Sequence, residues 1–103
     1  MPTLFVFTEH SPENCAVNNE KVKKAVLEFS SKAPPLRKKH GIKSVGSWTF
    51  EPEHQTISIV EVPSVDAWLK YGMEPEVMKY AALQTRNYFK VGMAWEEFGK
   101  LLK

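Results

Sequence analysis

The strand-like segments of this chain carry apolar side chains at both alternating positions, and this pattern constrains the fold more than any other feature. In the segment at residues 3–8, Leu4 and Val6 alternate with Phe5 and Phe7. Successive side chains of a β-strand point to opposite faces of the sheet. An antiparallel sheet with one face in water alternates apolar with polar residues instead. The sequence therefore predicts a sheet that is covered on both faces.

Local patterns give the order of the elements as β-α-β-β-α-β, followed by a short tail helix. Clusters of β-branched and aromatic residues predict strands at residues 3–8, 42–50, 56–62 and 86–93. Apolar residues at helical spacing predict a first helix that starts at residue 11, 18 or 19, a second from residue 64 and the tail helix from residue 95. We expect Pro34 and Pro35 to end the first helix. Gly72 should break the second, which restarts near Pro75 and continues to about Gln84.

This order is typical of an α+β, ferredoxin-like fold, with one antiparallel sheet and both helices on one of its faces. Residues 1–103 are expected to form a single domain. The helices leave the second apolar face uncovered. We predict a homodimer, packed sheet against sheet, because most soluble oligomers are symmetric dimers. The alternative is that the tail helix folds back over this face.

Composition and charge exclude several classes of partner. Fourteen basic against twelve acidic residues give a formal net charge of +2, too small to indicate a nucleic acid partner. The third strand, "TISIVEV", lacks the aromatic and glycine residues of an RNA-recognition motif. Basic residues between positions 21 and 43, including Arg37, are expected to form a solvated face. No apolar run approaches the roughly 20 residues that span a bilayer, and no secretory signal is visible.

The cysteine content indicates the compartment. Cys15 is the only cysteine, which excludes an internal disulfide and fits a reducing environment. We therefore expect a cytoplasmic protein.

Chain direction gathers polar side chains at one rim of the predicted sheet. The first strand ends at His10 with Cys15 close behind, and the turn between the second and third strands carries Glu51, Glu53 and His54. The first and third strands are neighbours in this fold, so His10 should lie near His54. Imidazole, thiolate and carboxylate groups are ligands for Zn, Ni, Cu and Fe. We predict a divalent transition metal site formed by His10, Cys15, His54 and Glu53.

Two other interpretations of these residues remain open. The same groups could carry out acid–base chemistry, with His10 as the candidate catalytic residue. They could also have no chemical role, with Cys15 as a small buried hydrophobe in the core.

A second candidate site lies between the sheet and the helices. Trp48, Trp68, Tyr71 and Tyr80 could line an apolar pocket for a small ligand, although aromatic residues at such spacings are more often ordinary core. Arg86, which should lie at the same rim as the histidines, is a further candidate ligand contact.

Three stretches of the chain resemble a family of short bacterial and archaeal proteins of unknown function. They are "LFVFTEHSPENC", "GIKSVGSW" and "EPEHQTISIVEVPSVDAW". The family pattern has a strand that ends in histidine followed by Pro-Glu-x-Cys, then a Gly-x-Lys strand entry, then Pro-Glu-His-Thr. His10, Glu13, Cys15, Glu53 and His54 carry the resemblance, which spans most of residues 3–90. Gln55 departs from the pattern, since it stands between His54 and the threonine.

The resemblance implies a dimeric α/β barrel, because the family is grouped with such proteins. That superfamily includes cofactor-independent monooxygenases, muconolactone isomerase-like enzymes, haem-containing relatives and a small nickel-binding group. Three functions follow as alternatives. The first is a homodimer that binds a metal ion or small ligand at the rim. The second is a monooxygenase- or isomerase-like enzyme with a pocket between sheet and helices, and the third is a non-catalytic interaction or regulatory module.

Overall fold

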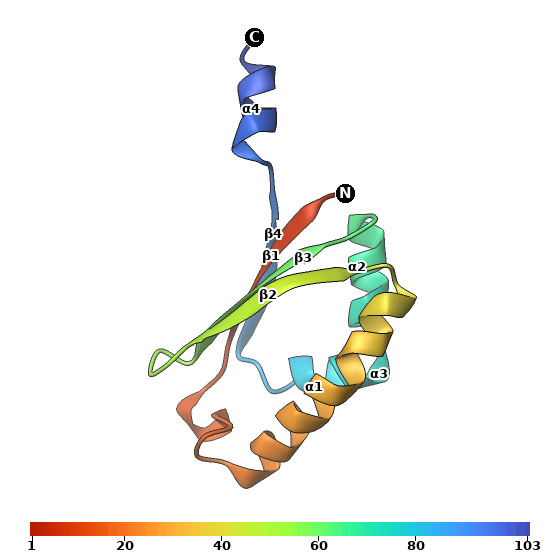
Figure 1. Ribbon diagram of the computed structural model, residues 1–103. Helices are drawn as coiled ribbons and strands as arrows, with labels where there is room; N and C mark the ends of the chain where they lie inside the picture. Colours follow the sequence, from red (N-terminus) through yellow and green to blue (C-terminus); the bar gives the residue numbers. More distant parts are fainter.

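A computed structural model describes residues 1–103 and shows the predicted β-α-β-β-α-β order followed by a tail helix (Figure 1). The ferredoxin-like fold class is confirmed. The strands are β1 (Thr3–Glu9), β2 (Lys43–Phe50), β3 (Gln55–Glu61) and β4 (Arg86–Gly92). The helices are the short 3-10 helix η1 (Pro12–Asn14), α1 (Glu20–Lys39), α2 (Val65–Gly72), α3 (Pro75–Ala81) and α4 (Trp95–Leu101).

The four strands form one antiparallel sheet in the order β2-β3-β1-β4. As predicted, β1 and β3 are central neighbours, and their register pairs Thr8 with Thr56 and Glu9 with Gln55. On the far side of β3, Thr49 of β2 also pairs with Thr56. Residues that face each other across a ladder share one face of the sheet, so this register assigns each strand residue to one of two faces.

The helix-covered face holds the core. Its central residues are buried, and they pack against α1, α2 and α3 (Figure 1). The buried cluster consists of Leu4, Val6, Ile42, Val60, Val62 and Tyr71. Leu4 and Val62 are fully buried. The alternation of buried and half-buried positions along β1 follows from this one-sided cover.

The opposite face of the sheet has no cover within the chain, and we call it the open face. Register places on it the side chains of Phe5, Phe7, Trp48, Phe50, Ile57, Ile59 and Tyr88. Phe7 and Tyr88 stack with their ring centroids 5.1 Å apart. Half of the Trp48 surface is exposed. The second apolar face that the sequence predicts is therefore present.

Helix α1 continues past Pro34 and Pro35, so the expectation that these prolines end it is wrong. The two missing amide hydrogens would have met the carbonyls of Ser30 and Ser31 one turn earlier. Both serines and both prolines are exposed, so water can satisfy those carbonyls, while Ala33 keeps the inner face of the helix buried. The side chain of Asn19 caps the start of α1, accepting from the Val22 amide at 3.2 Å.

The end of the chain lies apart from the layers. Helix α3 ends at Ala81, slightly earlier than expected, and β4 leads into α4, which projects beyond the sheet (Figure 1). Trp95 on α4 is 82% exposed. The tail helix therefore leaves the open face uncovered, contrary to the alternative considered above. None of the helices combines the length and the apolar character of a bilayer-spanning segment.

Candidate metal centre

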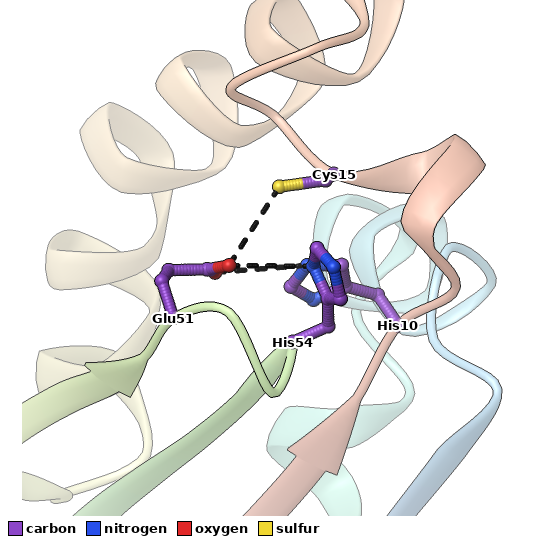
Figure 2. Close-up of side chains that lie close together, drawn as sticks. All are labelled: His10, Cys15, Glu51 and His54. Carbon is purple, nitrogen blue, oxygen red and sulfur yellow. Dashed lines mark hydrogen bonds and ion pairs between the residues drawn. The ribbon is translucent and has the colours of Figure 1, made fainter.

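Four donor side chains meet at one rim of the sheet: His10, Cys15, Glu51 and His54 (Figure 2). One donor atom from each lies within 4.8 Å of all the others. Nδ1 of His54 is 3.3 Å from Nε2 of His10 and 3.3 Å from Oε2 of Glu51. Nε2 of His10 is 3.9 Å from Oε1 of Glu51, and the Cys15 sulfur is 4.0 Å from Oε2.

The pairing of β1 with β3 positions the two histidines. Beyond the last ladder pair, the His10 amide donates to the His54 carbonyl at 3.0 Å. Both residues lie two positions beyond the Thr8–Thr56 pair, so their side chains return to the helix-covered face. His54 adopts a left-handed φ of 57°, a conformation that histidine enters more readily than most residues. The side chains are mostly buried, with exposures of 12% for His10 and 21% for His54.

Cys15 reaches the group from the helix layer. It follows η1 directly, and its amide donates to the Pro12 carbonyl at 3.3 Å. The Asn19 side chain donates to the Glu13 carbonyl at 2.8 Å and ties this segment to the start of α1. Cys15 is 2% exposed. Its thiol therefore closes the group on the side opposite the sheet (Figure 2).

The carboxylate of the group belongs to Glu51, whereas the sequence prediction named Glu53. Glu51 comes directly after β2 and keeps the strand alternation, two positions beyond Thr49 on the helix-covered face. The Thr49 hydroxyl donates to Oε1 of Glu51 at 3.3 Å. Glu53 lies further along the turn, is exposed, and is not among the grouped donors. Glu51 and Glu53 have the same parity as Thr49, so spacing alone could not distinguish them; Glu51 still follows the orientation of β2, whereas Glu53, two residues further into the turn, does not join the group.

The donor separations suit a small divalent cation. Metal–ligand bonds of about 2.0–2.3 Å place tetrahedral donors about 3.3–3.8 Å apart. The closest contacts at the centre, 3.3 Å from His54 to His10 and to Glu51, already match this spacing. Cys15 would need only a small side-chain adjustment to approach. Two nitrogens, one sulfur and one oxygen form a mixed donor set that favours late transition metals over Mg²⁺ or Ca²⁺.

A partly open cavity of about 450 Å³ lies between the sheet and the helices. Its floor is formed by hydroxyl-bearing residues of the sheet, including Thr8, Thr49 and Thr56, and Thr8 and Thr56 are hydrogen-bonded to each other. These three threonines form one row across β1, β3 and β2. His10, Glu51 and His54 lie one row further along on the same face, just beyond the ends of these strands. The candidate metal centre therefore lies at one end of the cavity floor.

Aromatic residues of the helices form the roof of the cavity. Three of the four aromatic residues considered as pocket lining from the sequence are on this side: Tyr71, Trp68 and Tyr80. Phe29 of α1 joins them and stacks on Tyr80 with ring centroids 4.1 Å apart. Burial raises the pKa of both Tyr71 and Tyr80 above the usual value of 10.0, so both phenols remain protonated at neutral pH.

The other two candidate ligand contacts, Trp48 and Arg86, lie at the border of the cavity and at the rim of the sheet, respectively. Trp48 borders the cavity, but register places its indole on the open face, where a Cβ added at Gly46 would meet the ring at 2.9 Å. Arg86 does not line the cavity. It pairs with Glu9 on the open face, and its guanidinium lies 4.5 Å from the centre of the Tyr88 ring.

Sequence reasoning missed Arg37. It was assigned to a solvated basic face, yet it is half-buried and lines the cavity. The one sequence feature that could have indicated a position at the cavity is its spacing: Arg37 lies four residues after Ala33 and therefore on the same, inner side of α1.

Comparisons with known proteins support the fold. No family model matches the chain, and no curated protein matches it. Among solved structures, it is similar to an antibiotic biosynthesis monooxygenase, with a TM-score of 0.60, 11% identity, and coverage of 91% of this chain and 98% of that one. It is similar to Rv0793 from Mycobacterium tuberculosis, with a TM-score of 0.59, 14% identity and coverage of 89% and 92%.

An uncharacterized NIPSNAP domain protein from Burkholderia xenovorans is also similar, with a TM-score of 0.58, 9% identity and coverage of 92% and 97%. At these identities the likeness is one of fold. It agrees with the ferredoxin-like architecture implied by the motif resemblance.

Proposed function

We propose that this protein binds one divalent transition metal ion through His10, Cys15, Glu51 and His54. The observation that carries the proposal is the convergence of four ligand-type side chains from three separate segments, all within 4.8 Å of one another. Three of the four are mostly or fully buried. A group of this kind, withdrawn from water, is stabilised when a cation shares its lone pairs.

The ligand set favours Zn²⁺ or a neighbouring ion such as Co²⁺, Ni²⁺ or Cu²⁺. Four protein donors fill a tetrahedral coordination sphere, which is typical of structural zinc sites. Catalysis is therefore not required for the site to function. The unpaired thiol also favours a reducing compartment, the cytosol, where it stays available as a ligand.

Metal analysis of untagged protein tests the proposal. Equilibrium dialysis against Zn²⁺ should give one bound ion per chain, measured by elemental analysis. His10→Ala and His54→Ala should each lose that ion. His40→Ala is the matched control, because His40 is the third histidine and lies beside Glu74, outside the donor group. Equal loss of zinc in all three variants, or no stoichiometric zinc in the unmodified protein, would contradict the proposal.

The second part of the proposal is a homodimer formed through the open face. Phe5, Phe7, Ile57 and Ile59 form a continuous apolar surface over β1 and β3, extended by Trp48 on β2. Contiguous apolar patches of this kind mark interaction sites on soluble proteins. A two-fold axis through this face would bury the same residues of both copies.

The cavity supports a second candidate function, an enzyme of the monooxygenase or isomerase type. Its volume of about 450 Å³ lies within the range of small-molecule sites, and His10 stands at its end as an acid or base. This candidate predicts a protein that takes up no stoichiometric Zn²⁺ yet binds a small organic molecule between sheet and helices. The zinc dialysis experiment therefore separates the two candidates.

A further inference from the structure

We infer that the cavity binds a small apolar carboxylate whose anionic group is held by Arg37. This inference concerns the cavity of the second candidate function, but it requires only binding and does not depend on the metal centre. It rests on the pairing state of one arginine and on the distribution of polar groups along the cavity.

Arg37 is a cation without a carboxylate partner in the chain. Its side chain lines the cavity, and none of the ion pairs of the structure includes it. The acidic residue at this end of α1, Glu74, is engaged by Lys39 at 3.2 Å and His40 at 3.6 Å. A half-buried guanidinium beside an apolar cavity is stabilised by an anion, and its planar fork matches a carboxylate.

Tyr71 adds a neutral donor at the same end. Tyr71 lines the cavity together with Arg37. Burial raises the pKa of its phenol above the usual value, and hydrogen bonding to Arg37 and the charge of Arg37 only partly offset that rise. The phenol therefore keeps its proton at neutral pH. A carboxylate placed here could accept from both the guanidinium and the phenol.

The remainder of the cavity suits an apolar ligand group of about the size of an aromatic ring. Phe29, Tyr80 and Trp68 line the side formed by the helices. Along β3 the cavity floor runs from Val60 to Thr56, a distance of four residue steps, or about 13 Å. The carboxylate end lies near the start of β2, because the Ile42 amide donates to the Arg37 carbonyl at 2.9 Å. The far end of the ligand points toward the threonine row.

A matched pair of probes tests the inference. 2-Naphthoate and its neutral analogue 2-naphthamide differ in charge but hardly in shape. Each is titrated into the full-length protein by calorimetry, in EDTA, so that a failure of the metal proposal does not affect the result. We expect 2-naphthoate to bind about tenfold or more tightly than the amide, since a charge-assisted hydrogen bond contributes about 1.5–3 kcal/mol.

Variants identify the residue responsible. Arg37→Gln should remove the preference for the carboxylate and leave the affinity for 2-naphthamide unchanged. Arg86→Gln is the control, because Arg86 is the only other arginine and lies outside the cavity. It should leave both affinities unchanged. The amide titration also verifies that the Arg37→Gln cavity is intact.

Three results would overturn the inference. They are a failure of 2-naphthoate to bind at millimolar concentration, equal affinity of the unmodified protein for the two probes, and an unchanged preference in Arg37→Gln. The comparison of the two probes on the unmodified protein needs no variant, so a folding defect in Arg37→Gln would not leave the inference untested.

Discussion

The His10 amide donates to the His54 carbonyl at 3.0 Å, and the same two residues bring their ring nitrogens to 3.3 Å. The backbone bond extends the β1–β3 pairing past its last ladder pair, Glu9 with Gln55. It fixes the spacing of the two imidazoles before any side-chain interaction forms. The donor group is therefore largely preorganised by the sheet, which reduces the entropic cost of binding an ion.

The choice of carboxylate gives a first prediction. Glu51→Gln should weaken Zn²⁺ affinity at least about tenfold, because a neutral amide replaces an anionic oxygen donor. Glu53→Gln removes the same charge from the same turn, outside the donor group, and should leave the affinity unchanged. Competition with a chromophoric chelator measures both. A larger effect at Glu53 than at Glu51 would show that the turn rearranges on binding.

The single cysteine gives a second prediction. Thiolate coordinated to a metal is a poor nucleophile, so Zn²⁺ should protect Cys15 from iodoacetamide. If only the metal-free site reacts, the alkylation rate falls about 100-fold at 100 times the dissociation constant. Mass spectrometry follows the reaction, because the chain has no other cysteine. Mg²⁺ should give no protection, and EDTA should reverse the protection that Zn²⁺ gives. An alkylation rate that Zn²⁺ does not change would exclude Cys15 as a ligand.

The open face gives a third prediction. Light scattering at micromolar concentration should report twice the 11.8 kDa of the chain. Ile57→Lys places a charge at the centre of the open face, which a dimer would bury at high cost, and should yield a monomer. Val91→Lys is the control, since register places Val91 with Leu4 on the other face and it is already exposed. A monomeric unmodified protein would refute the proposed dimer.

The contact between α1 and α3 gives a fourth prediction, on pH. The hydrogen bond from Lys39, helped by His40, holds the pKa of Glu74 below its usual value of 4.5. A carboxyl group with a lowered pKa in the folded state stabilises the fold above its unfolded pKa, and this contribution is lost as the pH falls through the folded value. Glu74→Gln should therefore lower the free energy of unfolding at neutral pH, with a smaller difference below pH 4.5.

Urea unfolding at the two pH values measures that difference. The matched control is Glu97→Gln, which removes a carboxylate that forms no ion pair. Its effect should not depend on pH in this way. A difference for Glu74→Gln that grows in acid would contradict the expected sign.

Much of the architecture follows from local patterns. Clusters of β-branched and aromatic residues located the four strands, and the order of elements was enough to predict that His10 and His54 share one rim. The two apolar faces were also predicted, because Leu4 and Phe5 point in opposite directions in any strand. These features depend on backbone alternation and topology, which the sequence encodes within a few residues.

The errors concern features that depend on distant packing. Pro34 and Pro35 lie within a helix because the carbonyls they leave unpaired face water. Glu51 rather than Glu53 lies in the donor group because Glu51 still follows the alternation of β2, whereas Glu53, further into the turn, does not. Arg37 was assigned to the surface because a single charged residue on the inner side of a helix resembles its solvated neighbours until the cavity beneath it is known.

The origin of the four donors has a mechanical consequence. His10, Glu51 and His54 come from the sheet, whereas Cys15 comes from the segment that leads into α1. An ion at this rim would form a reversible cross-link between the sheet and the helix layer, at one end of the cavity between them. Metal binding would hold the sheet and the helix layer together at that end. Removal of the ion would allow the two layers to separate there first.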